Sequence, residues 1–242
     1  MDIHSRLPNA TLGFPDSNCG SDVLETMEKF LDNPDVTLCG SKMFILLKRS
    51  PNQTDIPTRL VQKLQKFHST FTVLASDTPS GGTNPKLMYE LASLTQGFCA
   101  FDDDNTFYTS IGYIPMSGTR YLLYAQDPEV SGQGSRDLPP LVVPANCNCW
   151  FEMAIEDSGS TASVQKAMLN WFNSSSPPET FGIPGSKGTG LFTGNHLGSW
   201  EALNQTVYSV FLDFEYSDAR SRRVQIRVYQ NDPVDYWIPY DD

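Results

Sequence analysis

The sequence predicts a mixed fold, with an α/β part at the front of the chain and an antiparallel β-sandwich behind it. Residues 21–101 alternate between amphipathic helical runs and apolar strand-like runs, as in layered domains with a largely parallel sheet. After Asp102-Asp103-Asp104, short β-branched and aromatic runs are separated by Pro, Gly and Ser, which is typical of antiparallel sandwiches. We therefore expect two domains: a partial, doubly wound α/β domain over residues 1–104 and a β-sandwich over 105–242.

Helices are expected in the first domain over residues 21–32, 55–67 and 85–95. The first begins at Ser21, whose side chain can cap a helix, and ends before Asn33-Pro34. Each run carries apolar residues at helical spacing, so each predicts a helix with one buried face.

Strands should alternate with these helices. The run Lys42 to Leu47 is continuously apolar after its lysine, which predicts a central strand buried on both faces. Further strands are expected over residues 71–75 and 98–101. Between them, the loop 76–83 contains Pro79 and a Gly81-Gly82 pair, which break a strand and favour tight turns.

The second domain should contain several short strands. We expect them at residues 108–114, 121–125, 150–155, 207–216 and 224–229. In the segment 164–172 the apolar residues also fit helical spacing, so its sequence alone allows either element. Its β-rich neighbourhood favours a strand.

The net charge of -11 disfavours nucleic acid and anionic membranes as partners, because both are themselves negatively charged. No apolar run is long enough for a membrane-spanning helix, so membrane insertion is not expected either. The first fourteen residues also lack the apolar centre of a secretory signal. The partner left by these exclusions is a protein or glycan ligand of unknown identity.

Acceptor sequences for N-glycosylation occur at Asn9, Asn52, Asn173 and Asn204, each in a polar or turn-like context. Together they favour a secreted, extracellular protein. The cysteines permit two disulfides with one thiol left over; the candidates are Cys19, Cys39, Cys99, Cys147 and Cys149.

The pairing of these cysteines is open. Cys147 and Cys149 lie two apart on an expected strand, a geometry that does not favour a mutual bridge, so each is expected to pair elsewhere. Cys19 and Cys39 flank the first helix and could bridge only if the chain runs straight back after Asp32.

Catalytic patterns are weak in this sequence. Its histidines are His4, His68 and His196, and no G-x-S-x-G motif is present. We therefore expect a protein that is not an enzyme. The acidic run Asp102 to Asp104 could ligate calcium, but adjacent side chains point in different directions, which favours a solvated domain junction.

Residues 70–104, TFTVLASDTPSGGTNPKLMYELASLTQGFCAFDDD, resemble the later portion of a von Willebrand factor A domain. The chain also looks like a nematode-restricted family of secreted, uncharacterised multidomain proteins, in which a similar segment precedes a β-rich region. The closing run VQIRVYQNDPVDYWIPYDD carries that second likeness. Neither resemblance names an activity.

The A-domain resemblance implies adhesion through a metal ion at the carboxyl ends of the strands. Candidate ligands are Ser17, Ser21, Asp77 and Thr83. The aspartate-serine-serine motif of the family's first strand has no counterpart here, and Lys48-Arg49 follows the strand where the family would place an acidic residue. We therefore expect no cofactor, with a divalent cation at Asp77, Ser17 and Thr83 as the alternative.

The function predicted from these observations is an extracellular, non-enzymatic binding or adhesion module of unknown ligand. Exposed loops on a rigid scaffold would carry recognition. Two alternatives belong to other classes: a hydrolase using carboxylates in the cleft between the domains, and a structural spacer of a larger secreted protein.

Overall fold

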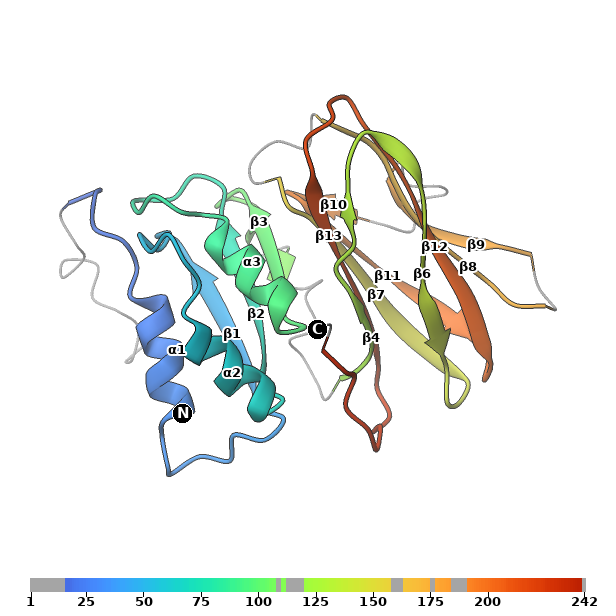
Figure 1. Cartoon of the computed structure of the whole chain (residues 1–242), viewed down its shortest axis with the longest axis horizontal. Coiled ribbons are helices and arrows are strands. Elements are labelled where there is room, and N and C mark those ends of the chain that lie inside the picture. The colour runs from blue at the N-terminus through green and yellow to red at the C-terminus, as the bar shows by residue number, and fades with distance from the viewer. Residues whose placement is uncertain are drawn as a thin grey trace.

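The computed structural model describes residues 16–107, 110–111, 120–157, 163–174, 177–183 and 191–240. The chain combines helices with sheets, and strands account for most of its regular structure. Figure 1 shows an α/β half, running from α1 to β3, beside a β half, running from β4 to β13. The antiparallel sheets that the sequence predicts are present in the β half.

The α/β half is built on a parallel sheet of β1 (Lys42–Leu47), β2 (Thr70–Ser76) and β3 (Phe98–Asp102). Its strand order is β1-β2-β3, with Lys42 paired to Thr70 and Thr72 paired to Phe98. The strands follow one another across the sheet in chain order. The described sheet therefore lacks the reversal of strand order that defines a doubly wound sheet.

The helices are α1 (Val23–Leu31), α2 (Thr58–Lys66) and α3 (Leu87–Leu94), close to the predicted ranges. Right-handed crossovers between successive neighbouring strands place α2 and α3 on the same face of the sheet. All three helices lie in front of the sheet in Figure 1. Their apolar faces join one core with β2 and β3, as helical spacing predicted.

The prediction that Lys42 to Leu47 forms a central strand buried on both faces is wrong. The strand exists with the predicted bounds, but in the described residues β1 is an edge strand that pairs with β2 alone. Leu46 is 53% exposed. A continuous apolar run shows that both faces of a strand prefer apolar surroundings, but it does not determine how many strands lie beside it.

The β half consists of two antiparallel sheets. The larger has the order β10-β11-β7-β13-β4, with β5 also pairing β13, and the smaller has the order β6-β12-β8-β9. The larger contains β4 (Tyr121–Gln126), β5 (Glu129–Val130), β7 (Cys147–Ile155), β10 (Leu191–Thr193), β11 (His196–Leu203) and β13 (Arg222–Gln230). The smaller contains β6 (Gln133–Val142), β8 (Val164–Phe172), β9 (Glu179–Ile183) and β12 (Val207–Tyr216).

These two sheets share one apolar core. Phe151 of β7 meets Trp171 of β8 across it, with ring centroids 4.7 Å apart. The choice of a strand for residues 164–172 is therefore confirmed, because β8 buries Trp171 against the opposite sheet. Four further predicted strands correspond to β4, β7, β12 and β13.

Part of the strand predicted at residues 108–114 is instead helical. Ser110 donates its backbone N–H to Thr106 O at 3.0 Å, which is the spacing of a helical turn. Of that predicted strand, only residues 110 and 111 are described. The sequence analysis did not predict several of the strands, including β6. This strand lies at the edge of its sheet, where its two prolines and its exposed residues are tolerated.

The two halves meet along the open edge of β3. Cys99 donates its backbone N–H to Gln225 Oε1 at 2.9 Å, and Arg227 Nε donates to Gly97 O at 2.9 Å. The hydroxyl of Tyr89 on α3 donates to Ala154 O at 2.8 Å. Side chains of each half thus hydrogen-bond backbone groups of the other, including the Cys99 N–H, which an exposed edge strand would leave to solvent.

Candidate functional site

An aromatic cleft lies between the two halves, with a volume of about 350 Å³. From the α/β half it is lined by residues at the amino ends of β1 and β2, including Lys42 and Thr70. From the β half it is lined by Arg120, the start of β4 and the C-terminal segment, residues 231–240. Its rings are those of His68, Tyr121, Tyr229, Tyr236, Trp237 and Tyr240.

The C-terminal segment forms one wall of this cleft. Gln96 holds it by donating Nε2 to Ile238 O at 3.1 Å and to Pro239 O at 2.6 Å. In Figure 1 this end of the chain returns from β13 to the space between the halves. The wall therefore belongs to the β half by sequence and is fastened to the α/β half by hydrogen bonds.

Ring stacking fixes the same segment at the end of α2. The imidazole of His68 stacks on Trp237 with centroids 4.6 Å apart, and its centroid lies 6.0 Å from that of Tyr240. His68 follows the helix with φ 47°, the left-handed conformation common just after a helix end. Gly40 makes room on this side, because a Cβ there would lie 3.0 Å from Trp237.

Two basic side chains line the cleft. Lys42 donates Nζ to Arg120 O and lies over the ring of Tyr121, 5.8 Å from its centroid. Burial lowers the pKa of Lys42, and the nearby charge of Arg120 lowers it further. Among the described residues, neither Lys42 nor Arg120 forms an ion pair with an acidic group.

The guanidinium of Arg120 is positioned by aromatic rings. It lies 5.2 Å from the ring centroid of Trp150 and 4.8 Å from that of Trp200, within the range of cation–π attraction. Its Nη1 atom is buried and has no hydrogen-bond partner among the residues described. A buried donor that lacks an acceptor is energetically unfavourable.

Glu152 lies near Arg120 on β7 and is buried in the sheet. Burial raises the pKa of its carboxyl to about 8, against the opposing influence of the Trp150 indole N–H, Arg120 and Arg227. Within the described structure, neither carboxyl oxygen has a hydrogen-bond partner of good geometry. At pH 7 this side chain is therefore mostly neutral and leaves the charge of Arg120 largely uncompensated.

The site expected at the carboxyl ends of the parallel strands is organised around a lysine. Lys48 donates Nζ to Ser76 Oγ at 3.0 Å and to Thr78 O at 2.7 Å, and it pairs with Asp104. Asp77 lies nearby, with its pKa raised by burial and by the neighbouring acidic residues of the 102–104 run. The ammonium group thus lies among oxygen atoms of the kind that bind a hard cation.

The residues predicted to bind a metal take part in different hydrogen bonds. Ser17 and Thr83 lie near the loop of Gly82, where Ser17 O accepts the Gly82 N–H and Thr83 Oγ1 hydrogen-bonds Asn52 Oδ1. Asp77 instead donates its backbone N–H to Asp102 O. In the part of the chain that is described, no group of three His, Cys, Asp or Glu side chains could hold a metal ion.

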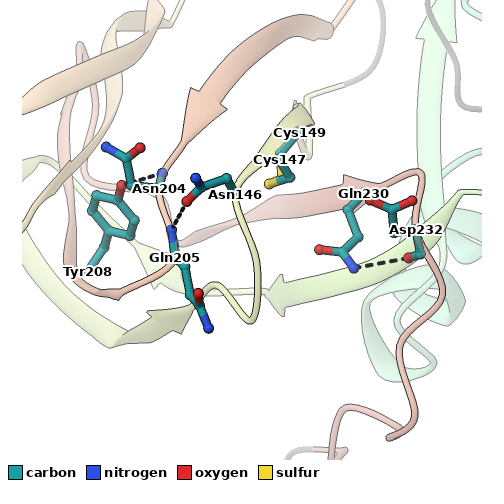
Figure 2. The surroundings of a disulfide bond; sticks show 8 residues. All are labelled: Asn146, Cys147, Cys149, Asn204, Gln205, Tyr208, Gln230 and Asp232. Carbon is teal, nitrogen blue, oxygen red and sulfur yellow. Dashed lines mark hydrogen bonds between the residues drawn. A yellow bond between two sulfur atoms is a disulfide. The ribbon is translucent and has the colours of Figure 1, made fainter.

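Two cysteines correct the sequence-based expectation. Cys147 and Cys149 form a disulfide with each other at the start of β7, as Figure 2 shows. Their Cα atoms are 5.5 Å apart, which is within bridging range, whereas an ideal strand places such residues about 6.6 Å apart. The strand end is therefore contracted, a local departure that ideal strand geometry did not predict. Cys19, Cys39 and Cys99 are free thiols.

The predicted glycosylation sites differ in their surroundings. Asn9 lies outside the described residues. Asn204 is exposed in a turn beside the disulfide, and Asn173 is half-buried. Asn52 is exposed, but its Nδ2 donates to Asn18 O at 2.8 Å, so its amide is already in use. Among the described residues, no helix is both long and apolar enough to cross a membrane.

Sequence reasoning missed the aromatic cleft, because its walls come from five separate segments of the chain. One signal was present, the aromatic spacing of Tyr236, Trp237 and Tyr240 near two prolines at the end of the chain. A segment so rich in rings but lacking strand alternation indicates docking against another surface.

The comparisons with known proteins concern mainly the β half. A family model described as a domain of unknown function, DUF7154, matches residues 126–231, from the end of β4 to just past β13. No curated protein matches the chain. The family similarity thus covers the antiparallel strands and names no activity.

Solved structures resemble the chain only distantly. A capsid structure of Helicobacter pylori bacteriophage KHP30 has 10% identity and a TM-score of 0.29, over 46% of this chain and 93% of that chain. Pseudomonas aeruginosa AlgX has 12% identity and a TM-score of 0.34, over 79% of this chain and 48% of that chain. The Macrobrachium rosenbergii nodavirus P-domain has 10% identity and a TM-score of 0.26, over 46% of this chain and 90% of that chain.

Proposed function

We propose that this chain is a non-enzymatic extracellular binding module that holds a small ligand, or one residue of a larger one, in the aromatic cleft. One observation carries the proposal: ring-bearing residues of both halves, with a few polar groups, converge on one concave site. Mostly apolar walls with a small number of placed polar groups are the usual character of ligand pockets. A cleft of about 350 Å³ suits a ligand of one or two rings.

The position of the cleft supports binding by a prearranged site. Trp237 is 55% exposed although His68 stacks on it, so part of its ring remains open to a ligand. The same wall is hydrogen-bonded to Gln96 in the other half. Binding to groups that are already held in place costs less conformational entropy than binding to mobile ones.

A metal-independent mode of binding is part of the proposal. The ammonium of Lys48 supplies positive charge at the carboxyl ends of the strands, where an A-type domain would hold a metal ion. That the α/β half is a partial von Willebrand A-like domain also remains a proposal. The proposed ligand site lies at the other end of the same sheet, by the amino ends of β1 and β2.

An extracellular location is proposed from two modest observations. The Cys147–Cys149 disulfide would persist in an oxidising compartment, and Asn204 presents an acceptor sequence on an exposed turn. Secretion from eukaryotic cells behind a supplied signal peptide tests the location. Glycan attachment at Asn204, lost in Asn204→Gln, supports it; a secreted protein with neither glycan nor disulfide would contradict it.

The hydrolase alternative requires carboxylates in a cleft between the halves, and it gains no support from Asp77 or Asp102. Asp102 is buried and accepts hydrogen bonds from Thr106 and Ser110 side chains, and neither Asp102 nor Asp77 lines the aromatic cleft. A general acid and base must face one pocket with opposed protonation states. The spacer alternative predicts no ligand at all, which the following experiment distinguishes.

The test is ligand-observed NMR on the full chain with four ring probes: glucose, glucuronate, benzyl alcohol and benzoate. We expect saturation transfer to at least one probe in the wild type and its loss in Tyr236→Ala, since Tyr236 lines the cleft and is exposed. Phe172→Ala removes an exposed ring on β8, outside the cleft, and should leave binding unchanged. Absence of transfer to every probe would overturn the proposed function.

A further inference from the structure

The charge inside the aromatic cleft is opposite to that of the protein as a whole. The chain carries a formal net charge of -11, yet the cleft contains Lys42 and Arg120 without an ion-pair partner among the described residues. Two neighbouring cations repel each other, and their partial burial strengthens this repulsion. A bound anion would offset that unfavourable interaction.

Both cations are held in place before any ligand arrives. Lys42 is fixed by its hydrogen bond to Arg120 O, and Arg120 by the rings of Trp150 and Trp200. A guanidinium stacked on rings still presents its N–H groups at the edge of its plane, where carboxylate oxygens bind. Arg120 lines the cleft, and its buried Nη1 has no acceptor in the described structure.

Among the described residues, the acidic groups nearby do not take this role. Glu152 is mostly neutral at pH 7 because burial raises its pKa to about 8. Asp235 lines the cleft but is exposed, and it forms an ion pair with neither cation. Arg227, the other cation near Glu152, is already paired with Asp127. Within the described part of the chain, Lys42 and Arg120 are therefore the positive charges that line the cleft without an ion-pair partner.

We propose that the ligand is a small organic anion, a ring bearing one carboxylate, with the carboxylate bound by Lys42 and Arg120 and the ring against the aromatic wall. This inference rests on the proposed function, since it requires the cleft to be the ligand site. The ring is a saturated sugar or an aromatic one, and the test separates the two by using a charged and a neutral probe of each.

The experiment compares glucuronate with glucose and benzoate with benzyl alcohol, by titration of the full chain followed by the chemical shifts of its indole N–H groups. The anionic member of one pair should bind about tenfold more tightly, because hydrogen bonds to charged groups contribute about 1.5–3 kcal/mol. Which pair shows the preference identifies the kind of ring.

Lys42→Gln removes one cation while keeping a hydrogen-bond donor, and it should reduce the preference to less than threefold. Lys66→Gln is the matched control, since Lys66 is exposed on α2 and does not line the cleft. Arg120→Gln tests the second cation, and thermal unfolding checks that each variant is folded. Raising the salt concentration should also reduce the preference.

The results separate the charge of the ligand, the role of Lys42 and Arg120, and the cleft itself. Equal binding of charged and neutral probes overturns the anionic ligand but leaves the cleft as a binding site. A preference that survives in both Lys42→Gln and Arg120→Gln overturns the assignment to these residues. Binding of no probe overturns the proposed function, and this inference with it.

Discussion

Asn195 hydrogen-bonds both backbone polar groups of Phe101. Its Oδ1 accepts the Phe101 N–H at 2.6 Å, and its own backbone N–H donates to Phe101 O at 3.2 Å. Its Nδ2 donates to Ile155 O at 2.5 Å. One residue of the β10–β11 turn therefore takes the place of a neighbouring strand for β3 and ties it to β7.

Asn195→Ala should destabilise the protein by about 2–4 kcal/mol, because it leaves a buried N–H and a buried carbonyl without partners. Urea unfolding followed by fluorescence and circular dichroism measures this. Asn105→Ala is the control, since Asn105 is exposed and its side chain hydrogen-bonds nearby Asp103 among the described residues; it should cost less than 1 kcal/mol. A loss below 1 kcal/mol for Asn195→Ala would show that the contact does not join the halves.

Glu152→Gln should stabilise the protein increasingly as pH rises. The pKa of the buried carboxyl is about 8, above the ordinary value of 4.5. The wild type therefore has its full contribution from this group below pH 4.5 and loses it progressively as pH approaches 8. Between pH 5 and pH 8 the advantage of the variant should grow by about 2–5 kcal/mol.

Denaturant unfolding at several pH values measures this growth. Glu179→Gln, which changes an exposed residue of β9, should show no comparable pH dependence. An advantage that stays constant between pH 5 and pH 8 would mean that Glu152 is solvated or ion-paired in the folded protein.

Breaking the Cys147–Cys149 disulfide should cost little stability. A bridge that closes only three residues removes little entropy from the unfolded chain, so the expected loss is about 1.6 kcal/mol or less. Unfolding of Cys147→Ala/Cys149→Ala against the oxidised wild type measures it. Alkylation under denaturing, non-reducing conditions should label three cysteines; five labelled cysteines would show that the bond is absent.

Calcium should leave the thermal unfolding of the wild type unchanged within about 1 °C, because the Lys48 ammonium already pairs with Asp104 at the carboxyl ends of the strands. Scanning calorimetry with millimolar calcium, and with magnesium in parallel, measures this. A calcium-specific rise of several degrees would restore the metal site considered for Asp77, Ser17 and Thr83.

Local patterns predicted most of the elements and little of their assembly. The apolar stripes that gave α1, α2 and α3 depend on residues a few positions apart, and so does the alternation that gave β12. The edge position of β1 depends on which strands lie beside it, which no local pattern contains. The cleft depends on long-range docking, since His68 meets Trp237 across about 170 positions of sequence.

Strand β1 carries a lysine at its first position, Lys42, and is followed by another, Lys48. Six residues of extended chain separate them by about 20 Å, roughly twice the distance over which physiological salt screens exposed charges. Changes at the two positions should therefore combine additively in free energy. A change at Lys42 could therefore alter what the cleft binds, while Lys48 continues to pair with Asp104 at the carboxyl ends of the strands.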